Sequence, residues 1–208
     1  VGARTVVGVS ATGSLREGLA PGDLALPSQY LDFTRGGRAA SFFGNGIVAH
    51  VSTAQPVCMA TSRLVADCAA RLGLPIQVGQ TYACVEGPRL GTRAESRFLR
   101  AAGADLVGMT NVPEAFLACE AQLGYASIAV VPDYDCRLGD PAQHVTAEMA
   151  LRLFRENLGR VQQLLATVVE HHVDDESRPC RQSLRHALVT PRERLTPSQR
   201  ELVDFLAT

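Results

Sequence analysis

Short apolar runs alternate with amphipathic stretches along much of the chain. The apolar runs are bounded by Gly, Pro, Asp or Asn and predict buried strands, whereas apolar residues between them recur every three or four positions, as on one face of a helix. Strands that alternate with helices predict a layered α/β fold. The expected strands are 5–9, 81–85, 105–110 and 125–131, and the expected helices are 60–72, 92–100, 113–122, a longer helix after Thr146 and a last helix after Pro197.

The segment 105–131 contains a strand, a helix and a second strand in close succession. Two strands joined by a helix are usually parallel neighbours with a right-handed crossover. We therefore expect 105–110 and 125–131 to lie side by side in the sheet. Thr110 would then lie at the carboxyl end of the first of these strands, at the edge where α/β sheets bind their ligands.

The composition restricts the kind of partner that the protein can bind. The 208 residues are 46% hydrophobic and 20% charged, which suits one globular domain over 1–208 with a sizeable core. A net charge of -1 offers no broad basic surface for nucleic acid or acidic lipid. A small molecule is therefore the expected partner.

Cysteine usage and hydropathy indicate the compartment. Six cysteines are scattered without a Cys-x-x-Cys pair, which predicts reduced thiols in a cytoplasmic protein and no metal site. No apolar run approaches the roughly 20 residues that cross a bilayer, so no membrane partner is expected. The chain begins without Met and enters an apolar strand at Thr5, which suggests that it starts inside a larger fold.

Two acidic residues, Asp133 and Asp135, follow the apolar run 125–131 almost directly. Residues two apart on an extended chain project to the same side, so both carboxylates would share one face. Asp is also common at strand ends because it favours turns, and the spacing alone leaves both interpretations open. A second candidate is 10–14, where Ser and Thr flank a glycine in a turn that could bring backbone N–H groups to an anion, although such clusters are also ordinary loop sequence.

Several motifs occur in order between residues 4 and 170. They are Ser10-Ala11-Thr12-Gly13-Ser14-Leu15, Pro21-Gly22-Asp23, Glu86-Gly87-Pro88-Arg89, Arg93-Ala94-Glu95-Ser96, Gly108-Met109-Thr110 and Asp133-Tyr134-Asp135-Cys136. Together they resemble the methylthioadenosine phosphorylase group of the purine nucleoside phosphorylase family. That resemblance implies a three-layer α/β/α fold with a central mixed sheet, and reversible phosphorolysis of a 5'-thio-substituted purine nucleoside in a homotrimer. Phosphate is then a co-substrate, and no metal or organic cofactor is implied.

The resemblance also implies roles for individual residues. Cleaving an N-glycosidic bond moves negative charge onto the departing base, so a protonated Asp133 could donate to its imidazole-ring nitrogen. Asp135 could accept from an exocyclic amine and could keep Asp133 protonated by like-charge repulsion. Glu86 and Arg89 are expected to organise their loop. The other implied contacts are Tyr134 for the purine, Ser10, Ala11 and Thr110 for phosphate, Met109 for the ribose and His50 for the 5' end of the sugar, although His50 could also be an ordinary histidine on a strand.

The chain departs from the family pattern in ways that leave the substrate open. Family members carry an upstream segment with a glycine-rich phosphate loop and an Arg-His pair, and this N-terminal part of the domain is expected to be missing. Gly91 replaces a serine that helps to read the purine, and Ala147 is smaller than the residue usual at its position, which affects selectivity for the 5' group. A phosphorylase for a 6-oxopurine nucleoside and a non-catalytic assembly partner remain as alternatives.

Overall fold

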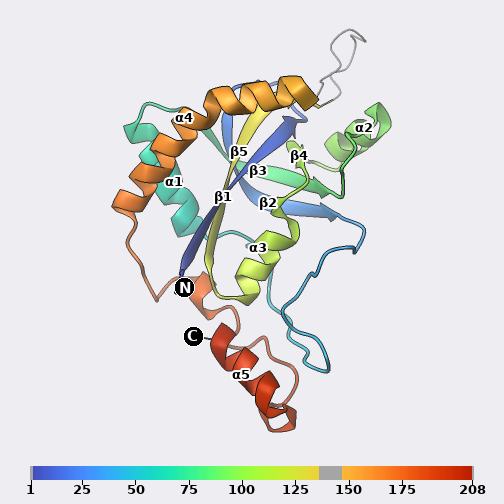
Figure 1. Ribbon diagram of the computed structural model, residues 1–208, viewed down its shortest axis with the longest axis vertical. Coiled ribbons are helices and arrows are strands. Elements are labelled where there is room, and N and C mark those ends of the chain that lie inside the picture. Colours follow the sequence, from blue (N-terminus) through green and yellow to red (C-terminus); the bar gives the residue numbers. More distant parts are fainter. Residues whose placement is uncertain (1, 136–146, 208) are drawn as a thin grey trace.

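Strands and helices alternate in the computed structural model, which describes residues 2–135 and 147–207 (Figure 1). The strands are β1 (Thr5–Ser14), β2 (Leu24–Phe33), β3 (Ile76–Val85), β4 (Leu106–Gly108) and β5 (Gly124–Tyr134). The helices are α1 (Met59–Arg71), α2 (Arg93–Ala101), α3 (Asn111–Glu120), α4 (Ala147–His171) and α5 (Pro197–Leu206). Two short 3-10 turns, η2 (Pro179–Gln182) and η3 (Arg192–Arg194), lie between α4 and α5.

The described strands form one mixed sheet that closes on itself. The pairs β1–β5, β2–β3 and β3–β4 are parallel, whereas β1–β4 and β2–β5 are antiparallel. The order around the sheet is therefore β1, β4, β3, β2, β5 and back to β1. Helices flank this sheet, so the predicted α/β fold with a central mixed sheet is confirmed (Figure 1). The closure of the sheet goes beyond that prediction.

The prediction that strands 105–110 and 125–131 are neighbours is wrong. β1 lies between them, parallel to β5 and antiparallel to β4 (Figure 1). The β1–β5 pairing extends from Thr5 to Ser14, whereas β4 contains only 3 residues. Because the longer ladder satisfies more backbone N–H and C=O groups, β1 occupies the position beside β5 that β4 was expected to take.

Two further differences concern β1 and β2. Residues 10–14, which were expected to form a turn, continue β1, because Gly13 and Ser14 pair with β4 on one side and β5 on the other. β2 has no counterpart among the predicted strands, since Pro27 and the polar residues after it interrupt the apolar pattern. The ladder between β2 and β3 shifts register on both sides of Pro27, so the sheet accommodates a residue that has no N–H to donate.

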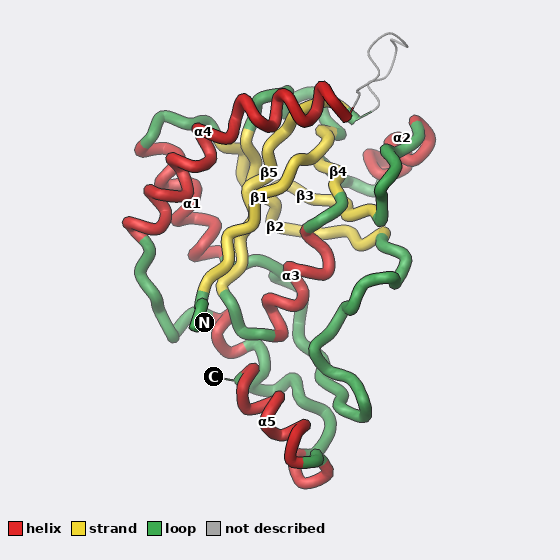
Figure 2. Tube along the Cα trace, in the orientation of Figure 1, coloured by secondary structure: helices red, strands yellow, loops and turns green. Residues whose placement is uncertain are grey.

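Helices α1 and α4 lie side by side over one part of the sheet (Figures 1 and 2). α1 ends as the sequence predicts, because Gly73 just beyond it adopts a φ of +65°. Thr146, the expected cap of α4, lies outside the described residues. The buried core between these helices and the sheet includes Leu24 and Leu26 of β2, Val65 of α1, Ile128 and Val130 of β5, and Val161, Leu164 and Val168 of α4.

The C-terminal segment packs against the long connection between β2 and α1, at the lower end of the view in Figure 1. α5 is the last helix that the sequence predicts, and it begins at Pro197. Thr196 and Gln199 form a reciprocal capping box at its start. Ile47 is buried with Leu195 and Val203, which joins the two segments. Within residues 2–135 and 147–207, none of the helices has the length and apolar character needed to cross a bilayer.

Candidate active site

A cavity of about 700 Å³ lies where β1, β3, β4 and β5 end. Its volume is in the range of sites that bind small molecules. The residues of β1 and β5 reach it because these strands are parallel neighbours, and the loops after β3 and β4 complete its wall. Seven of the residues selected from the sequence line this cavity: Ser10, Ala11, Gly91, Met109, Thr110, Asp133 and Asp135.

Three other selected residues do not belong to the described lining. Tyr134 points elsewhere and donates its hydroxyl to Glu17 O at 3.3 Å. His50 is exposed, lies outside the named strands, and donates its backbone N–H to Ala187 O at 2.8 Å. The side chain of Ala147 lies outside the described residues.

Asp133 and Asp135 both face the cavity, as the period-two spacing predicts. Burial, and to a smaller extent the neighbouring Asp135 carboxylate, together raise the pKa of Asp133 to about 6. Asp135 Oδ2 accepts a hydrogen bond from Ser96 Oγ of α2. The two acids therefore differ in environment, with one biased towards the protonated form and the other holding a hydrogen-bond donor.

The position of Asp135 depends on a close approach of two strands and on one arginine. A Cβ on Gly13 would lie 2.9 Å from Asp135 Cβ and 3.2 Å from Asp133 Oδ1, so only glycine leaves room for both acids beside β1. Arg100 of α2 donates to Leu15 O at 2.8 Å and to Asp135 O at 2.6 Å. Arg100 thus joins the end of β1 to the end of β5.

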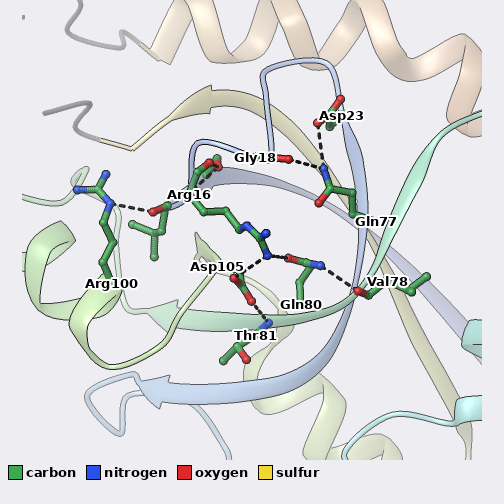
Figure 3. Close-up of polar contacts among 11 residues, drawn as sticks. Arg16, Gly18, Asp23, Gln77, Val78, Gln80, Thr81, Arg100 and Asp105 are labelled. Atoms are coloured by element: carbon green, nitrogen blue, oxygen red, sulfur yellow. Dashed lines mark hydrogen bonds and ion pairs between the residues drawn. The ribbon is translucent and has the colours of Figure 1, made fainter.

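A second polar network lies next to the end of β1 (Figure 3). Arg16 Nη1 donates to Gln80 Oε1 and to Asp105 Oδ1, each at 3.2 Å. Asp105 Oδ2 accepts from the backbone N–H of Thr81 at 2.9 Å. These contacts connect the loop after β1 with β3 and with the start of β4, and so hold the strands whose ends form the cavity.

Ser10, Ala11 and Thr110 offer donors to the cavity from β1 and from the loop after β4. Ser10 is only 6% exposed, and its Oγ has no well-formed hydrogen-bond partner among the described residues. A buried hydroxyl without a partner costs free energy unless a ligand or water satisfies it. Thr110 is exposed, and its backbone N–H makes only a long contact, 3.4 Å, with Tyr82 Oη.

Arg38 was not selected from the sequence, yet it organises the wall that carries Met109. Its guanidinium donates to Met109 O and Val112 O, each at 2.7 Å, and to Glu86 O at 3.1 Å. Arg38 Nε also pairs with Glu86 Oε1 at 3.4 Å. Because Arg38 lies in the irregular connection after β2, no periodic pattern marks it, and its place among small residues is the one local signal that could have drawn notice.

Replacing Arg38 by Met should lower kcat/KM for the reaction proposed below by about tenfold, because three carbonyls lose a charged donor and the Met109 loop loses its anchor. Steady-state kinetics, with circular dichroism to verify folding, would measure this. Arg63→Met, at an exposed position of α1, is the matched control and should keep wild-type kinetics. Equal kinetics for both variants would contradict the role of Arg38.

The loop after β3 is ordered by its own charged residues. Arg89 forms two hydrogen bonds with the carboxylate of Glu95, at 2.8 and 2.6 Å, and this pairing lowers the pKa of Glu95. Glu95 also completes a capping box with Thr92 at the start of α2. Glu86 and Arg89 are thus loop organisers, as expected, although both also line the cavity together with Arg35.

Within the described residues, no group of three or more His, Cys, Asp or Glu side chains is arranged to hold a metal ion.

Comparison with known proteins identifies the superfamily of this chain. Residues 1–171 match the model of the phosphorylase superfamily. The chain belongs to this superfamily, whose members share the fold described above.

Its relatives within the superfamily are more specific. The chain is 36% identical to an S-methyl-5'-thioadenosine phosphorylase of Geobacter sulfurreducens over 206 residues, which is 99% of this chain and 72% of that protein. A methylthioadenosine phosphorylase from an antarctic soil metagenomic library superposes with a TM-score of 0.87 at 37% identity, over 98% of this chain and 71% of that one. The methylthioadenosine phosphorylase of Schistosoma mansoni in complex with adenine has a TM-score of 0.80 at 30% identity, over 98% and 72% of the two chains.

Proposed function

We propose that the protein catalyses phosphorolysis of S-methyl-5'-thioadenosine, or of a similar purine nucleoside, to adenine and 5-methylthioribose 1-phosphate. The observation that carries this proposal is the pair Asp133 and Asp135 in the cavity, with the pKa of Asp133 raised to about 6. The relatives named above, which are called methylthioadenosine phosphorylases, support the same reaction. The protein is thus proposed to be a pentosyltransferase of purine and methionine salvage.

The reaction replaces a carbon–nitrogen bond by a carbon–oxygen bond at the anomeric carbon. As the base leaves, positive charge develops on the sugar and negative charge on the purine. Asp133, when protonated, donates to the imidazole-ring nitrogen and neutralises the leaving base. Asp135 holds the exocyclic amine, and Ser96 fixes one oxygen of its carboxylate. Phosphate then bonds to the anomeric carbon through one of its oxygens.

Phosphate binding is proposed for Ser10, Ala11 and Thr110, with Met109 against the ribose. The Ser10 hydroxyl is buried and lacks a well-formed partner within the part of the chain that the structure describes, which supports its role as a donor to a bound anion. Phosphate also supplies the negative charge that stabilises the cationic sugar in the transition state. No metal or organic cofactor is proposed.

Ser10→Ala should raise the KM for phosphate by about tenfold, because a hydrogen bond to a charged group is lost. The KM for the nucleoside should change little. Initial rates over a matrix of both substrate concentrations would separate the two constants. Ser127→Ala is a matched control, since Ser127 is also a buried serine with no well-formed partner in residues 2–135 and 147–207, but it lies outside the cavity lining. An unchanged phosphate KM in Ser10→Ala would contradict the assignment.

A homotrimeric assembly and a cytoplasmic location are proposed from the resemblance to the family. Contacts of His50 and Tyr134 with the substrate are proposed on the same ground, although neither residue belongs to the described cavity lining. Gly91 lines the cavity and Ala147 begins α4, and both are proposed to influence which nucleoside fits. The alternative substrate is a 6-oxopurine nucleoside such as methylthioinosine.

The direct test supplies the purified protein, with its intact mass verified, with methylthioadenosine or methylthioinosine. Each nucleoside is incubated with and without phosphate, and free base is followed by chromatography. Phosphate-dependent adenine release is the expected result. Release of hypoxanthine alone would replace the substrate but keep the reaction class, and no release of either base by folded protein would overturn the proposal for this chain.

A further inference from the structure

Cys58 and Cys180 are separated by 122 positions in the sequence, yet their sulfur atoms lie 3.2 Å apart. Neither residue lines the cavity described above. We propose that Cys58 and Cys180 form a redox site, at which a small-molecule disulfide oxidises the two thiols to an intramolecular disulfide. This site goes beyond the proposed phosphorolysis and does not depend on it.

Cys58 is held in a fixed position at the start of α1. It is the N-cap residue of this helix, and its carbonyl accepts from the backbone N–H of Ser62 at 2.9 Å. Its own N–H donates to Tyr125 O of β5 at 2.7 Å. Cys58 is 6% exposed, so the sulfur is packed in the interior and has little freedom to turn away from its neighbour.

Cys180 is held in place by contacts of two residues that follow it, Arg181 and Ser183. Arg181 is buried, and its guanidinium donates to Gln122 O at 3.2 Å and to Asp174 Oδ1 at 2.6 Å. Ser183 Oγ donates to Cys119 O at 2.5 Å. These contacts hold the backbone around Cys180 against the body of the protein, so the approach of the two sulfurs does not rest on a single flexible side chain.

The distance suits bond formation after a small adjustment. A disulfide requires a sulfur–sulfur distance of about 2.0 Å, so two sulfur atoms that lie 3.2 Å apart need to approach by only about 1.2 Å. Holding both thiols in place also removes most of the entropic cost of bringing them together. Once one cysteine has formed a mixed disulfide with the reagent, attack by the other cysteine is therefore favoured over release of the reagent.

The local electrostatics favour a thiolate at this site. The Cys180 thiol donates to Cys58, and backbone N–H groups at the first turn of α1 add to this effect, so the pKa of Cys58 is lowered in spite of its burial. The pKa of Cys180 is raised in turn by Cys58. By contrast, burial raises the pKa of Cys68, Cys84 and Cys119.

The proposed chemistry balances with a disulfide reagent as the oxidant. Cys180 is half-buried and so more accessible than Cys58, and it passes its proton to the Cys58 thiolate through their hydrogen bond. The Cys180 thiolate attacks one sulfur of the reagent, breaks its sulfur–sulfur bond and expels the first thiolate, which takes the proton from Cys58. The Cys58 thiolate then attacks the Cys180 sulfur and expels the second thiolate, which takes a proton from water. Two protein thiols are oxidised, and one disulfide is reduced to two thiols.

The product would attach the C-terminal segment covalently to the body of the protein. That segment contacts the connection before α1, where Ala49 and Leu188 form a bridge and Val189 N–H donates to Val48 O at 2.8 Å. The disulfide closes a long loop, so it should stabilise the folded state by restricting the unfolded chain. We expect the melting temperature to rise by about 5–15 °C on oxidation.

The test exposes the reduced wild-type protein to mixtures of oxidised and reduced glutathione. After quenching in acid, free thiols are alkylated under denaturing conditions and counted by intact mass. We expect the 6 thiols of the reduced chain to fall by two. Peptide mapping should then identify a link between the peptides that contain Cys58 and Cys180. Retention of all thiols in excess oxidised glutathione, a glutathione adduct without a link, or a link between other cysteines would overturn the proposal.

Two variants separate this site from the other cysteines. Cys180→Ser should abolish both the linked peptide and the rise in melting temperature. Cys119→Ser is the matched control because Cys119 is also half-buried and lies nearby, and it should retain both. A melting temperature that still rises on oxidation of Cys180→Ser would contradict the assignment to this pair.

Discussion

Replacing Asp133 by Asn should lower kcat/KM for phosphorolysis by about 10²–10⁴-fold, the usual contribution of a general acid. Asn keeps the size of the side chain and can still donate a hydrogen bond, but it cannot transfer a proton to the leaving base. Steady-state kinetics with methylthioadenosine and saturating phosphate would measure the loss. Asp32→Asn is the control, because Asp32 is exposed and lies outside the cavity lining. Its carboxylate accepts a hydrogen bond from the backbone N–H of Thr34.

The pH dependence gives a second readout of the same residue. Because the pKa of Asp133 is raised to about 6, the protonated acid predominates below that pH and decreases above it. Activity that depends on this proton should therefore fall as the pH rises through about 6. Phosphate also changes its ionisation near this range, so the ratio of wild-type to Asp133→Asn activity is the quantity to follow. A ratio that does not change between pH 5 and about pH 8 would contradict the role of Asp133 as the acid.

Replacing Gly108 by Ala should destabilise the protein by about 1–3 kcal/mol, the usual cost of overpacking a core. A Cβ at this position would lie 2.7 Å from Tyr82 Cζ and would also overlap Tyr82 Oη. Tyr82 cannot move away easily, because it is 0% exposed and its ring packs edge-on against Tyr30 at 5.7 Å. Thermal or denaturant unfolding would measure the loss.

The matched control for this substitution is Gly159→Ala in α4. A Cβ there meets nothing within 4 Å, and alanine is the better helix former. This variant should be neutral or more stable by about 0.5–1 kcal/mol. If Gly108→Ala unfolded at the wild-type temperature, that result would contradict the inference that Tyr82 leaves no room for a side chain at position 108.

Local patterns in the sequence predicted the helices well and the strands less completely. Helical spacing is a property of a single segment, so α1, α2 and α5 agree with their predicted ranges within a few residues. Strand pairing depends on segments far apart, and here a strand at the start of the chain pairs between two strands that are consecutive in sequence. β2 was missed for a related reason. Pro27 argues against a strand when only the local pattern is considered, but β2 pairs with β3 and β5, and a register shift at Pro27 accommodates the proline.

The amino-acid sequence by itself determined the α/β class, the identity of the paired acids and their common face, because alternation and helical periodicity follow from backbone geometry alone. Only the tertiary structure decided that Ser10, Gly91, Thr110 and the two acids line one cavity. It also decided that Arg38 supports the wall of this cavity and that the sulfur atoms of Cys58 and Cys180 lie close together. These contacts join residues that are distant in the chain. Their proximity follows from how the strands pair and close the sheet, which no local pattern encodes.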